Sequence, residues 1–336
     1  MELERAWMTR TLSGGQKQRL ITACTLATGQ KILILDEPLA NLDVPSTELL
    51  MKIFREKADQ GYAVLIIEHR IDRVIRYMDK IWAIKDKKIL PADFSLSEEH
   101  IITYRSDCKN TSPNKEIFSL KDVSLQLGKR EILKKISLNI KKGERILLLG
   151  ENGCGKTSLL RIMARLQKPS SGRFSHSLDS NMKRWFSKVG VVYQNPDYQL
   201  FMPTVKQEIA FSAVSAEYAL MITEMFGLKS IADRHPQSLS EGQKRRVTIA
   251  AVMASAPEVV LLDEPTVGQD IKWLKSMVDI LNRIHEETDN TMITVTHDVR
   301  CASALCDRAY VIKDGVICRT LLSEEVNDYL TAPLST

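Results

Sequence analysis

A glycine-rich segment carrying a lysine and a threonine is the first feature with residue types suited to chemistry. It reads GENGCGKTS, and it fits G-x-x-x-x-G-K-[ST]. Glycines let backbone N–H groups curl around a di- or triphosphate, and a following helix N-terminus adds partial positive charge. The pattern predicts a phosphate-binding loop in which Lys156 reaches the β- and γ-phosphates and Thr157 ligates Mg²⁺. The predicted nucleotide-binding residues are Gly150, Glu151, Asn152, Gly153, Cys154, Gly155, Lys156, Thr157 and Ser158.

Two adjacent carboxylates follow an apolar run further along the chain. Residues 259–262 read VVLL, and Asp263 and Glu264 come next. Such a pair could be solvated acids at a strand end. Downstream of a phosphate loop, however, Asp263 is placed to hold Mg²⁺ through water. Glu264 is placed to polarise the water that attacks the γ-phosphate. We therefore predict a nucleotide-hydrolysing site.

The elements around these residues must place them at one edge of a sheet. Residues 145–149 (RILLL) predict a strand directly before the loop, and SLLRIMARL predicts a helix directly after it. Four apolar residues in a row at 259–262 indicate a strand covered on both faces, hence a parallel sheet. The predicted fold class is α/β, of the phosphate-loop NTPase kind.

A self-similar pattern extends over the 336 residues at an offset of 227. TLSGGQ (11–16) matches SLSEGQ (238–243), and Asp36 matches Asp263; His69 and His297 lie 228 apart. Three landmarks in the same order predict a tandem duplication. The second unit has about 120 residues before its LSEGQ, whereas only eleven residues precede Leu12. We therefore expect residues 1–92 to be the C-terminal half of a first domain, 93–115 a polar linker, and 116–330 a complete second domain.

Composition narrows the class of protein. With 44% hydrophobic and 26% charged residues, 15 Gly and 11 Pro, the chain is neither disordered nor collagen-like. It has no apolar run of roughly 18 residues that could span a bilayer, and MELERAWMTR lacks the apolar core of a signal peptide. The net charge of +5 comes without a basic block, so no nucleic-acid partner is expected. Six cysteines without a CxxC pair predict reduced thiols and no zinc site.

Together, the phosphate loop, the LSGGQ-type signature, the LLDEP strand and the downstream histidine resemble the nucleotide-binding domain of ATP-binding-cassette proteins. The resemblance covers roughly residues 115–325 in the second unit and about residues 10–90 in the first. It implies a RecA-like core, an antiparallel β subdomain and a helical signature subdomain. It also implies that the signature segment of one cassette caps the ATP held by another. The implied signature residues are Leu12, Ser13, Gly14, Gly15 and Gln16 in the first unit, and Leu239, Ser240, Glu241, Gly242 and Gln243 in the second.

The resemblance also assigns roles to single residues. Gln194 matches the loop glutamine that senses Mg²⁺ and the attacking water, Glu264 the catalytic carboxylate, and His297 the histidine on the γ-phosphate. The implied metal ligands are Thr157, Gln194 and Asp263. Asp43 and Asp270 match the loop that communicates between sites. In the first unit the acidic and switch residues are Asp36, Glu37, Asp43 and His69.

Two positions depart from the family pattern. Leu127 stands where the family usually has an aromatic residue that stacks on adenine, about 23 positions before the phosphate loop. An aliphatic contact predicts weaker base affinity. Glu241 stands where the first signature has Gly14, which puts a carboxylate near the expected triphosphate and makes that signature slightly less favourable.

A narrower resemblance is carried by YQNPDYQLFMPTVKQEIAF (193–211) and PTVGQD (265–270), which look like the ATPases of energy-coupling-factor importers. Such importers take up vitamins or transition-metal ions. The resemblance implies a peripheral protein on the cytoplasmic face of the membrane. Its helical region would dock on transmembrane subunits, and ATP and Mg²⁺ would be its cofactors.

The unequal units leave several arrangements open. If they pair, only the second unit's phosphate loop can hold ATP, capped by Ser13 and Gly15, so we expect at most one ATP per chain. A second ATPase polypeptide could supply a front half, the first 90 residues could fold poorly, or two chains could form a homodimer capped by LSEGQ. The competing functions are a soluble cassette protein acting on ribosomes or DNA and a truncated inactive remnant.

Overall fold

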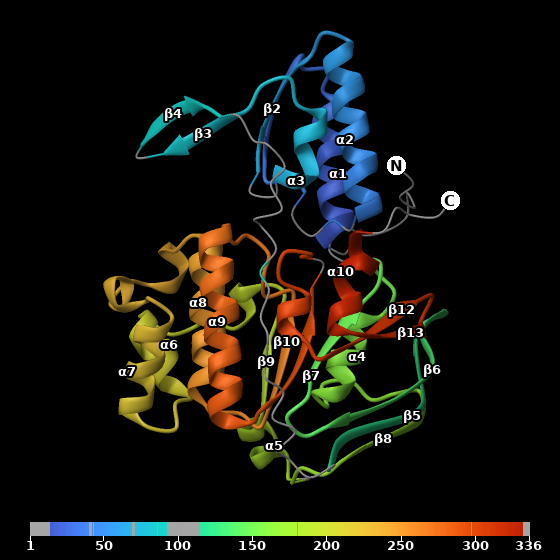
Figure 1. The fold of residues 1–336 in the computed structure, drawn as a ribbon, viewed down its shortest axis with the longest axis vertical. Helices are drawn as coiled ribbons and strands as arrows, with labels where there is room; N and C mark the ends of the chain where they lie inside the picture. Colours follow the sequence, from blue (N-terminus) through green and yellow to red (C-terminus); the bar gives the residue numbers. More distant parts are fainter. Residues whose placement is uncertain are drawn as a thin grey trace. The chain divides into compact units, whose positions relative to one another are not determined.

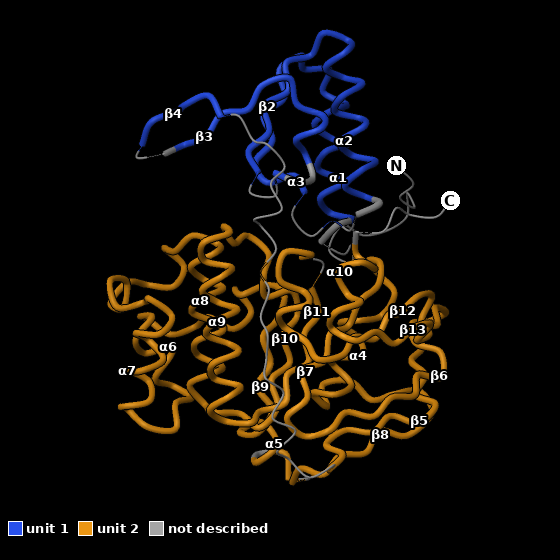
Figure 2. The backbone as a smooth tube through the Cα atoms, viewed as in Figure 1, with its two compact units in different colours: residues 1–100 blue, residues 101–336 orange. Residues whose placement is uncertain are grey.

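The computed structural model divides the chain into two compact units, residues 1–100 and 101–336 (Figure 2). It describes residues 14–39, 42, 44–68, 71–85, 87–92, 102, 115–179, 181–296 and 298–331. The division falls inside the predicted linker 93–115, of which only residues 102 and 115 are among those described. Each unit is treated by itself below.

The second unit is built on a six-stranded sheet of order β13-β12-β7-β11-β10-β9. All neighbours pair in parallel except β12 and β13, which are antiparallel. A separate antiparallel sheet has the order β6-β5-β8. The strands are β5 (Glu116–Leu127), β6 (Arg130–Lys141), β7 (Arg145–Leu149), β8 (Ser171–His176), β9 (Val189–Val192), β10 (Val259–Asp263), β11 (Thr291–Val295), β12 (Arg308–Lys313) and β13 (Val316–Leu322).

The helices of this unit cover both faces of the larger sheet (Figure 1). They are α4 (Lys156–Met163), α5 (Met182–Lys188), α6 (Val205–Phe211), α7 (Ala216–Met225), α8 (Glu241–Ala254), α9 (Ile271–Thr288) and α10 (Ser323–Thr331). The predicted strands at 145–149 and 259–262 are confirmed, and so is the helix after the phosphate loop. The observed α/β cassette fold agrees with the predicted class.

Alternate residues of β10 enter two different cores, because successive side chains of a strand point to opposite faces. Val260 and Leu262 pack in a cluster with residues of α8 and α9. Val259 and Leu261 pack in another cluster with Leu159 and Leu160 of α4 and with residues of β5 and β6. Every residue of β10 is therefore buried, as the uninterrupted apolar run predicts.

The first unit contains a two-stranded parallel sheet and a separate hairpin. Its elements are α1 (Gly14–Ala27), β1 (Ile32–Asp36), α2 (Val44–Asp59), β2 (Ala63–Ile67), α3 (Ile71–Val74), β3 (Trp82–Lys85) and β4 (Lys88–Pro91). Leu35 of β1 packs in a cluster with Leu50, Met51 and Phe54 of α2. The other face of the pair is exposed, and it carries Ile32, Ile34, Leu65 and Ile67.

The segment IWAIKD, although apolar in part, does not join this sheet. Among the described residues, its strand β3 pairs with β4 alone, in a two-stranded sheet. In the second unit, β12 joins the larger sheet by pairing with β7. The described residues of the first unit contain no strand in the position of β7. The hairpin therefore has nothing to bridge it to β2.

None of the helices in the described ranges combines the length and the apolar character that spanning a membrane requires.

Candidate nucleotide site

The phosphate loop is shaped by two glycines that no other residue could replace without strain. Gly150 has φ +145° and Gly155 has φ +109°, in the region that favours glycine. A Cβ on Gly150 would collide with the carbonyl oxygen of Ile312, and one on Gly155 would lie 2.5 Å from Leu133 Cδ2. Gly155 is also the N-cap residue of α4. The loop thus joins the end of β7 to the N-terminus of α4, where backbone N–H groups attract anions.

Lys156 closes the loop with its own side chain. Its Nζ donates to the carbonyl oxygen of Gly150 at 2.7 Å and to that of Glu151 at 2.8 Å. The side chain is buried. These bonds hold the Lys156 ammonium group over the loop. A bound polyphosphate would compete with the two carbonyl oxygens for hydrogen bonds from this group.

Thr157 and Asp263 meet although they lie far apart in the sequence. Thr157 Oγ1 donates to Asp263 Oδ1 at 3.2 Å. Burial raises the pKa of the Asp263 carboxyl, while Thr157 and the nearby Lys156 act in the opposite direction. A hydroxyl beside a carboxylate is the oxygen donor set that Mg²⁺ uses together with phosphate oxygens. The two residues therefore fit a Mg²⁺ ion.

Glu264 follows Asp263 in a backbone conformation that is unusual for a residue with a side chain. Its φ is +52°, and its N–H donates to the carbonyl oxygen of Val295 at 2.9 Å, which extends the β10–β11 pairing by one bond. The residue is 8% exposed. Non-glycine residues in this region are uncommon and cluster at functional sites.

Arg245 connects three parts of the site, and the sequence analysis missed it. Its Nη1 donates to the carbonyl oxygen of Glu264 at 2.8 Å, and its Nη2 donates to that of Gln194 at 2.7 Å. The side chain is only 2% exposed, and burial lowers its pKa, opposed by Glu241, Glu264 and Asp263. Helical spacing could have revealed it, because Arg245 shares a face of α8 with the buried Ile249.

The second signature segment begins α8. Ser240 is the N-cap residue, and it forms a capping box with Gln243: Gln243 N donates to Ser240 Oγ at 3.3 Å, and Ser240 N donates to Gln243 Oε1 at 3.2 Å. Gly242 lies against the backbone of Gly268, where a Cβ would be 2.8 Å from the carbonyl oxygen. Gln269 Nε2 donates to the Gly242 carbonyl at 3.1 Å. Gln269, which the sequence analysis did not single out, therefore joins the signature to the PTVGQD loop.

Asp270 caps a helix, a role that the sequence analysis did not assign. Its Oδ1 accepts a hydrogen bond from Trp273 N at 2.8 Å at the N-terminus of α9. The communicating role that the resemblance implied for Asp270 stays a prediction. Its carboxylate is already used to satisfy one of the free N–H groups that a helix start presents.

Several predicted residues lie outside the described part of the chain: Leu12, Ser13, Asp43, His69 and His297. The residues on either side of His297 are well anchored. Thr296 Oγ1 lies 2.7 Å from Thr266 Oγ1, and Asp298 forms a buried ion pair with Arg300 at 2.7 Å.

In the first unit, Gly14, Gly15 and Gln16 begin α1. Asp36 ends β1, and Glu37 follows it with φ +44° and donates from its N–H to the Ile67 carbonyl at 2.9 Å.

An apolar groove of about 670 Å³ lies between the loop after β9 and the helices α6 and α8. Three aromatic residues on its rim, Tyr198, Phe201 and Phe211, are at least 65% exposed. The rings of Phe201 and Phe211 meet edge to face with centroids 5.6 Å apart. The loop below is fixed by Glu208, whose Oε2 accepts from the N–H groups of Phe201 and Met202.

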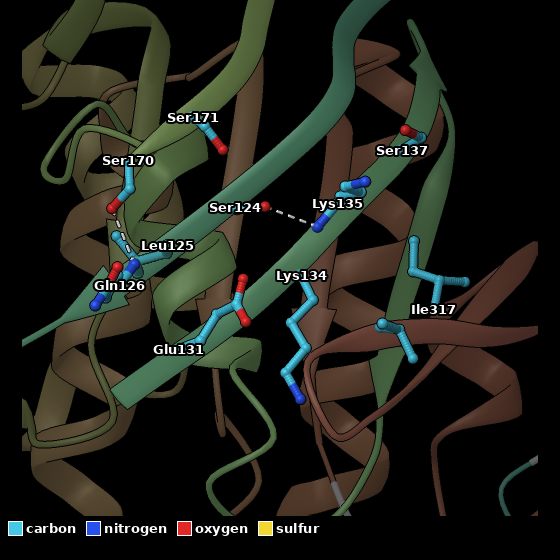
Figure 3. A pocket seen from close by; sticks show the side chains of 11 residues that line it. Ser124, Leu125, Gln126, Glu131, Lys134, Lys135, Ser137, Ser170, Ser171 and Ile317 are labelled. Atoms are coloured by element: carbon cyan, nitrogen blue, oxygen red, sulfur yellow. Dashed lines mark hydrogen bonds between the residues drawn. The ribbon is translucent and has the colours of Figure 1, made fainter. Parts of the chain in front are cut away.

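A larger polar cavity, of about 890 Å³, lies over β5, β6 and β8 (Figure 3). Two of its serines accept hydrogen bonds from backbone N–H groups. Ser124 Oγ accepts from Lys135 N and Ser170 Oγ accepts from Gln126 N, both at 2.9 Å (dashed lines in Figure 3). These bonds replace ladder bonds near places where the β5 register shifts. The serine hydroxyls are thus explained by the sheet itself.

The geometry defines a phosphate-loop nucleotide site on an α/β cassette, and comparison with known proteins agrees. A family model described as "ABC transporter" matches residues 2–40 and 133–267. The chain therefore belongs to the ABC transporter family.

Several relatives are similar over most of this chain. It is 30% identical to the putative HMP/thiamine import ATP-binding protein YkoD of Bacillus subtilis over 91% of its own length and 65% of that protein. It is 30% identical to a putative ABC transporter ATP-binding protein of Treponema denticola over 94% of its length and 70% of that protein. The chain spans just under two thirds of the length of the first two curated relatives, at 65% and 66%.

Solved structures match a single cassette. The structure of cbiO1 from Clostridium perfringens, described as part of the ABC transporter complex cbiONQ, has 30% identity and a TM-score of 0.56. The match covers 63% of this chain and 90% of that one. The ATP-binding cassette MJ0796, described as a dimer in a post-hydrolysis state bound to ADP and Pi, has 29% identity and a TM-score of 0.54. That match covers 62% of this chain and 99% of MJ0796.

Proposed function

We propose that this chain is the ATP-binding and ATP-hydrolysing subunit of an ABC importer of the energy-coupling-factor type, which takes up a vitamin or a transition-metal ion. The observation that carries the nucleotide-hydrolysing part of the proposal is the hydrogen bond between Thr157 and Asp263. It brings the start of α4 and the end of β10 together at the mouth of a glycine loop. The relatives YkoD and cbiO1 support the importer class by their descriptions.

Each residue of the site has a distinct task in hydrolysis. The N–H groups of the loop and Lys156 bind the β- and γ-phosphates. Thr157 and Asp263 would hold Mg²⁺, with Gln194 near it, and the ion would neutralise charge on the phosphate oxygens. Glu264 orients the attacking water and accepts its proton. His297, which lies outside the described residues, would contact the γ-phosphate.

Nucleotide binding is tested at Lys156. Lys156→Ala should abolish ATP binding, because it removes the charge that reaches the phosphates. Lys168→Ala, at an exposed position beyond α4, is the matched control and should bind as the wild type does. Isothermal titration with Mg-ATP measures both. Equal affinity in the two variants would refute the phosphate loop assignment.

We propose that the aromatic groove docks a helix of the transmembrane subunits, and that the chain lies at the cytoplasmic face of the membrane. Exposed aromatic rings around an apolar groove are typical anchors for a partner helix. Phe201→Asp should release the protein from membranes into the soluble fraction without changing ATP affinity. Leu220→Asp, at another exposed apolar position, is the control. If the wild type stayed soluble and bound ribosomes, the transport function would be wrong.

We also propose that residues 1–92 are the back half of a first cassette, joined by the linker 93–115 to a complete second cassette at 116–330. Three observations support this. The family model matches residues 2–40 as well as 133–267. The helices α1 and α2 and the strand β1 each begin 227 residues before α8, α9 and β10. Glu37 and Glu264 share the left-handed φ and the same bond to the neighbouring strand.

The two units are therefore expected to bind nucleotide unequally. A chain of these 336 residues should bind one ATP, at the loop 150–158, whether that site is capped by Ser13 and Gly15 or, in a dimer of chains, by Ser240 and Gly242. Titration of the monomer and of the dimer with Mg-ATP measures this ratio. Two ATP molecules per chain would contradict the proposal.

A further inference from the structure

A polar cavity of about 260 Å³ opens directly beside the phosphate loop. One wall is the loop itself, at residues 151–154, and another is the start of β6, at residues 130–134. The turn between β12 and β13, at residues 313–315, forms the third side. A nucleotide base is tied to its phosphates through a single sugar. A cavity continuous with the loop is therefore within reach of the base when the phosphates occupy the loop.

The start of β6 is held rigidly against two neighbours. Lys134 N donates to the carbonyl oxygen of Gly315 at 2.8 Å, and Gly315 approaches β6 so closely that a Cβ on it would lie 2.6 Å from Ile132 O. On the other side, Gly155 of the phosphate loop packs against Leu133. The backbone that carries Arg130 is thus fixed relative to the phosphate loop, as a binding surface requires.

The charges around this cavity are balanced, and this distinguishes it from a phosphate site. Its lining combines three cations with three carboxylates: Arg130, Lys134 and Lys313, and Glu131, Glu151 and Asp314. A second polyanion would not be favoured there, whereas an uncharged polar heterocycle would find donors and acceptors on every side.

Arg130 has the geometry of a stacking surface. A Cβ on Gly153 would lie 3.9 Å from Arg130 Nη2, so the guanidinium extends across the glycine of the loop. Within the described residues this exposed side chain makes no hydrogen bond or ion pair. Its cross-strand partner in the β5–β6 ladder is Leu127, an aliphatic residue that is 48% exposed. Planar guanidinium groups stack on nucleobases, whereas leucine cannot.

We propose that the guanidinium of Arg130, and not Leu127, is the surface on which the nucleobase stacks. The inference rests on the proposed nucleotide site and adds a residue that determines base affinity. Because stacking grows with ring area, purine triphosphates bind more tightly than pyrimidine triphosphates, while ATP and GTP bind alike. The phosphate loop makes the same contacts with the triphosphate whichever base the nucleotide carries.

The test compares Mg-ATP with Mg-tripolyphosphate, which has the phosphates but no base, by calorimetric titration of the full chain. Arg130→Ala should bind ATP about tenfold more weakly and tripolyphosphate as the wild type does. Arg130→Lys keeps the charge but loses the plane, so it should lose ATP affinity to the same extent. Arg130→Tyr restores a planar surface and should retain ATP. Lys129→Ala removes a neighbouring exposed cation that does not line the cavity, and it should change ATP affinity by less than about twofold.

Other results would overturn the inference. If Arg130→Ala weakened ATP and tripolyphosphate equally and Arg130→Lys restored both, the side chain would be acting as a charge on the phosphates. If Arg130→Ala bound ATP as the wild type does, the base would lie elsewhere. A wild type that bound neither ligand would instead refute the nucleotide site itself, so the two failures are distinguishable.

Discussion

The parallel pairs β1–β2 and β10–β11 have the same backbone and opposite surroundings. In one, Asp36 is aligned with Ile67; in the other, Asp263 is aligned with Val295. Each pair is continued by the N–H of the following glutamate. Yet every residue of β10 is buried, whereas β1 alternates between exposed and buried residues. The ladder and the turn after it are therefore formed without the second layer that covers β10.

What differs is the layer on the α4 side. Ile32 and Ile34 are 70% and 66% exposed, and the residues 227 positions later, Val259 and Leu261, are fully buried against α4, β5 and β6. On the opposite face, Leu35 is buried by α2 much as Leu262 is buried by α9. One helix on one face is enough to fix the register of a pair. Placing an acidic strand end beside a phosphate loop requires the other face as well.

The largest expected difference between the pairs is catalytic. Glu264→Gln should lower ATP turnover by at least about 100-fold, because it removes the proposed general base while it keeps the size of the side chain. Glu37→Gln changes the matching residue and should leave turnover unchanged. Steady-state phosphate release measures both. An equal loss in the two variants would mean that the first unit hydrolyses nucleotide too.

The next difference is in packing. Leu261→Ala should destabilise the second unit by about 2–5 kcal/mol, since it leaves a cavity in a closed core. Ile34→Ala, at the matching exposed position, should cost less than about 0.5 kcal/mol. Amide hydrogen exchange in β10 and β1 reports the two units separately. A loss of several kcal/mol at Ile34 would show that something covers this face in solution.

A smaller difference in stability between the two units is expected at Arg245 and at the matching position in the first unit. The counterpart of Arg245, 227 positions earlier, is Gln18, which is half-buried on α1. Arg245→Gln should destabilise the second unit by about 2–3 kcal/mol and slow turnover, because it leaves the carbonyl oxygens of Glu264 and Gln194 without their charged donor. Gln18→Arg should change stability by less than about 0.5 kcal/mol. Urea unfolding followed by hydrogen exchange would measure both, and unchanged stability in Arg245→Gln would contradict the role assigned to this side chain.

The smallest effect concerns the buried carboxyl of Asp263. Because burial raises its folded-state pKa, its ionised form opposes folding; this cost is fully present above the folded pKa and disappears as pH falls below the unfolded value. Without Mg²⁺ at pH 7, Asp263→Asn should therefore raise stability by about 1 kcal/mol and Tm by about 2–4 °C. The gain should shrink towards pH 4. Asp36→Asn, at an exposed carboxyl, should change neither value. A lower Tm for Asp263→Asn at pH 7 would show that the ionised carboxylate is stabilising.

The sequence was most informative where the signal is local. Continuous apolar runs predicted β7 and β10, and the glycine spacing predicted the loop between β7 and α4, because each depends on neighbours within a few residues. The pairing of β12 with β7 joins residues about 160 positions apart, and no local pattern shows that β3 has no such partner among the described residues. Arg245 was missed for a similar reason. In the sequence, a basic run after a signature segment predicts solvated side chains. The buried position of Arg245 becomes apparent only when the folded structure brings Glu264 and Gln194 next to it.

The guanidinium of Arg245 also has a mechanical consequence. Its two N–H donors belong to one planar, rigid group, and they bind carbonyl oxygens on the end of β10 and on the loop that leads into the aromatic groove. A displacement of that groove is therefore transmitted to the end of β10 through the rigid guanidinium group and its two hydrogen bonds. The loop cannot be displaced far without either carrying the Glu264 backbone with it or breaking a buried bond.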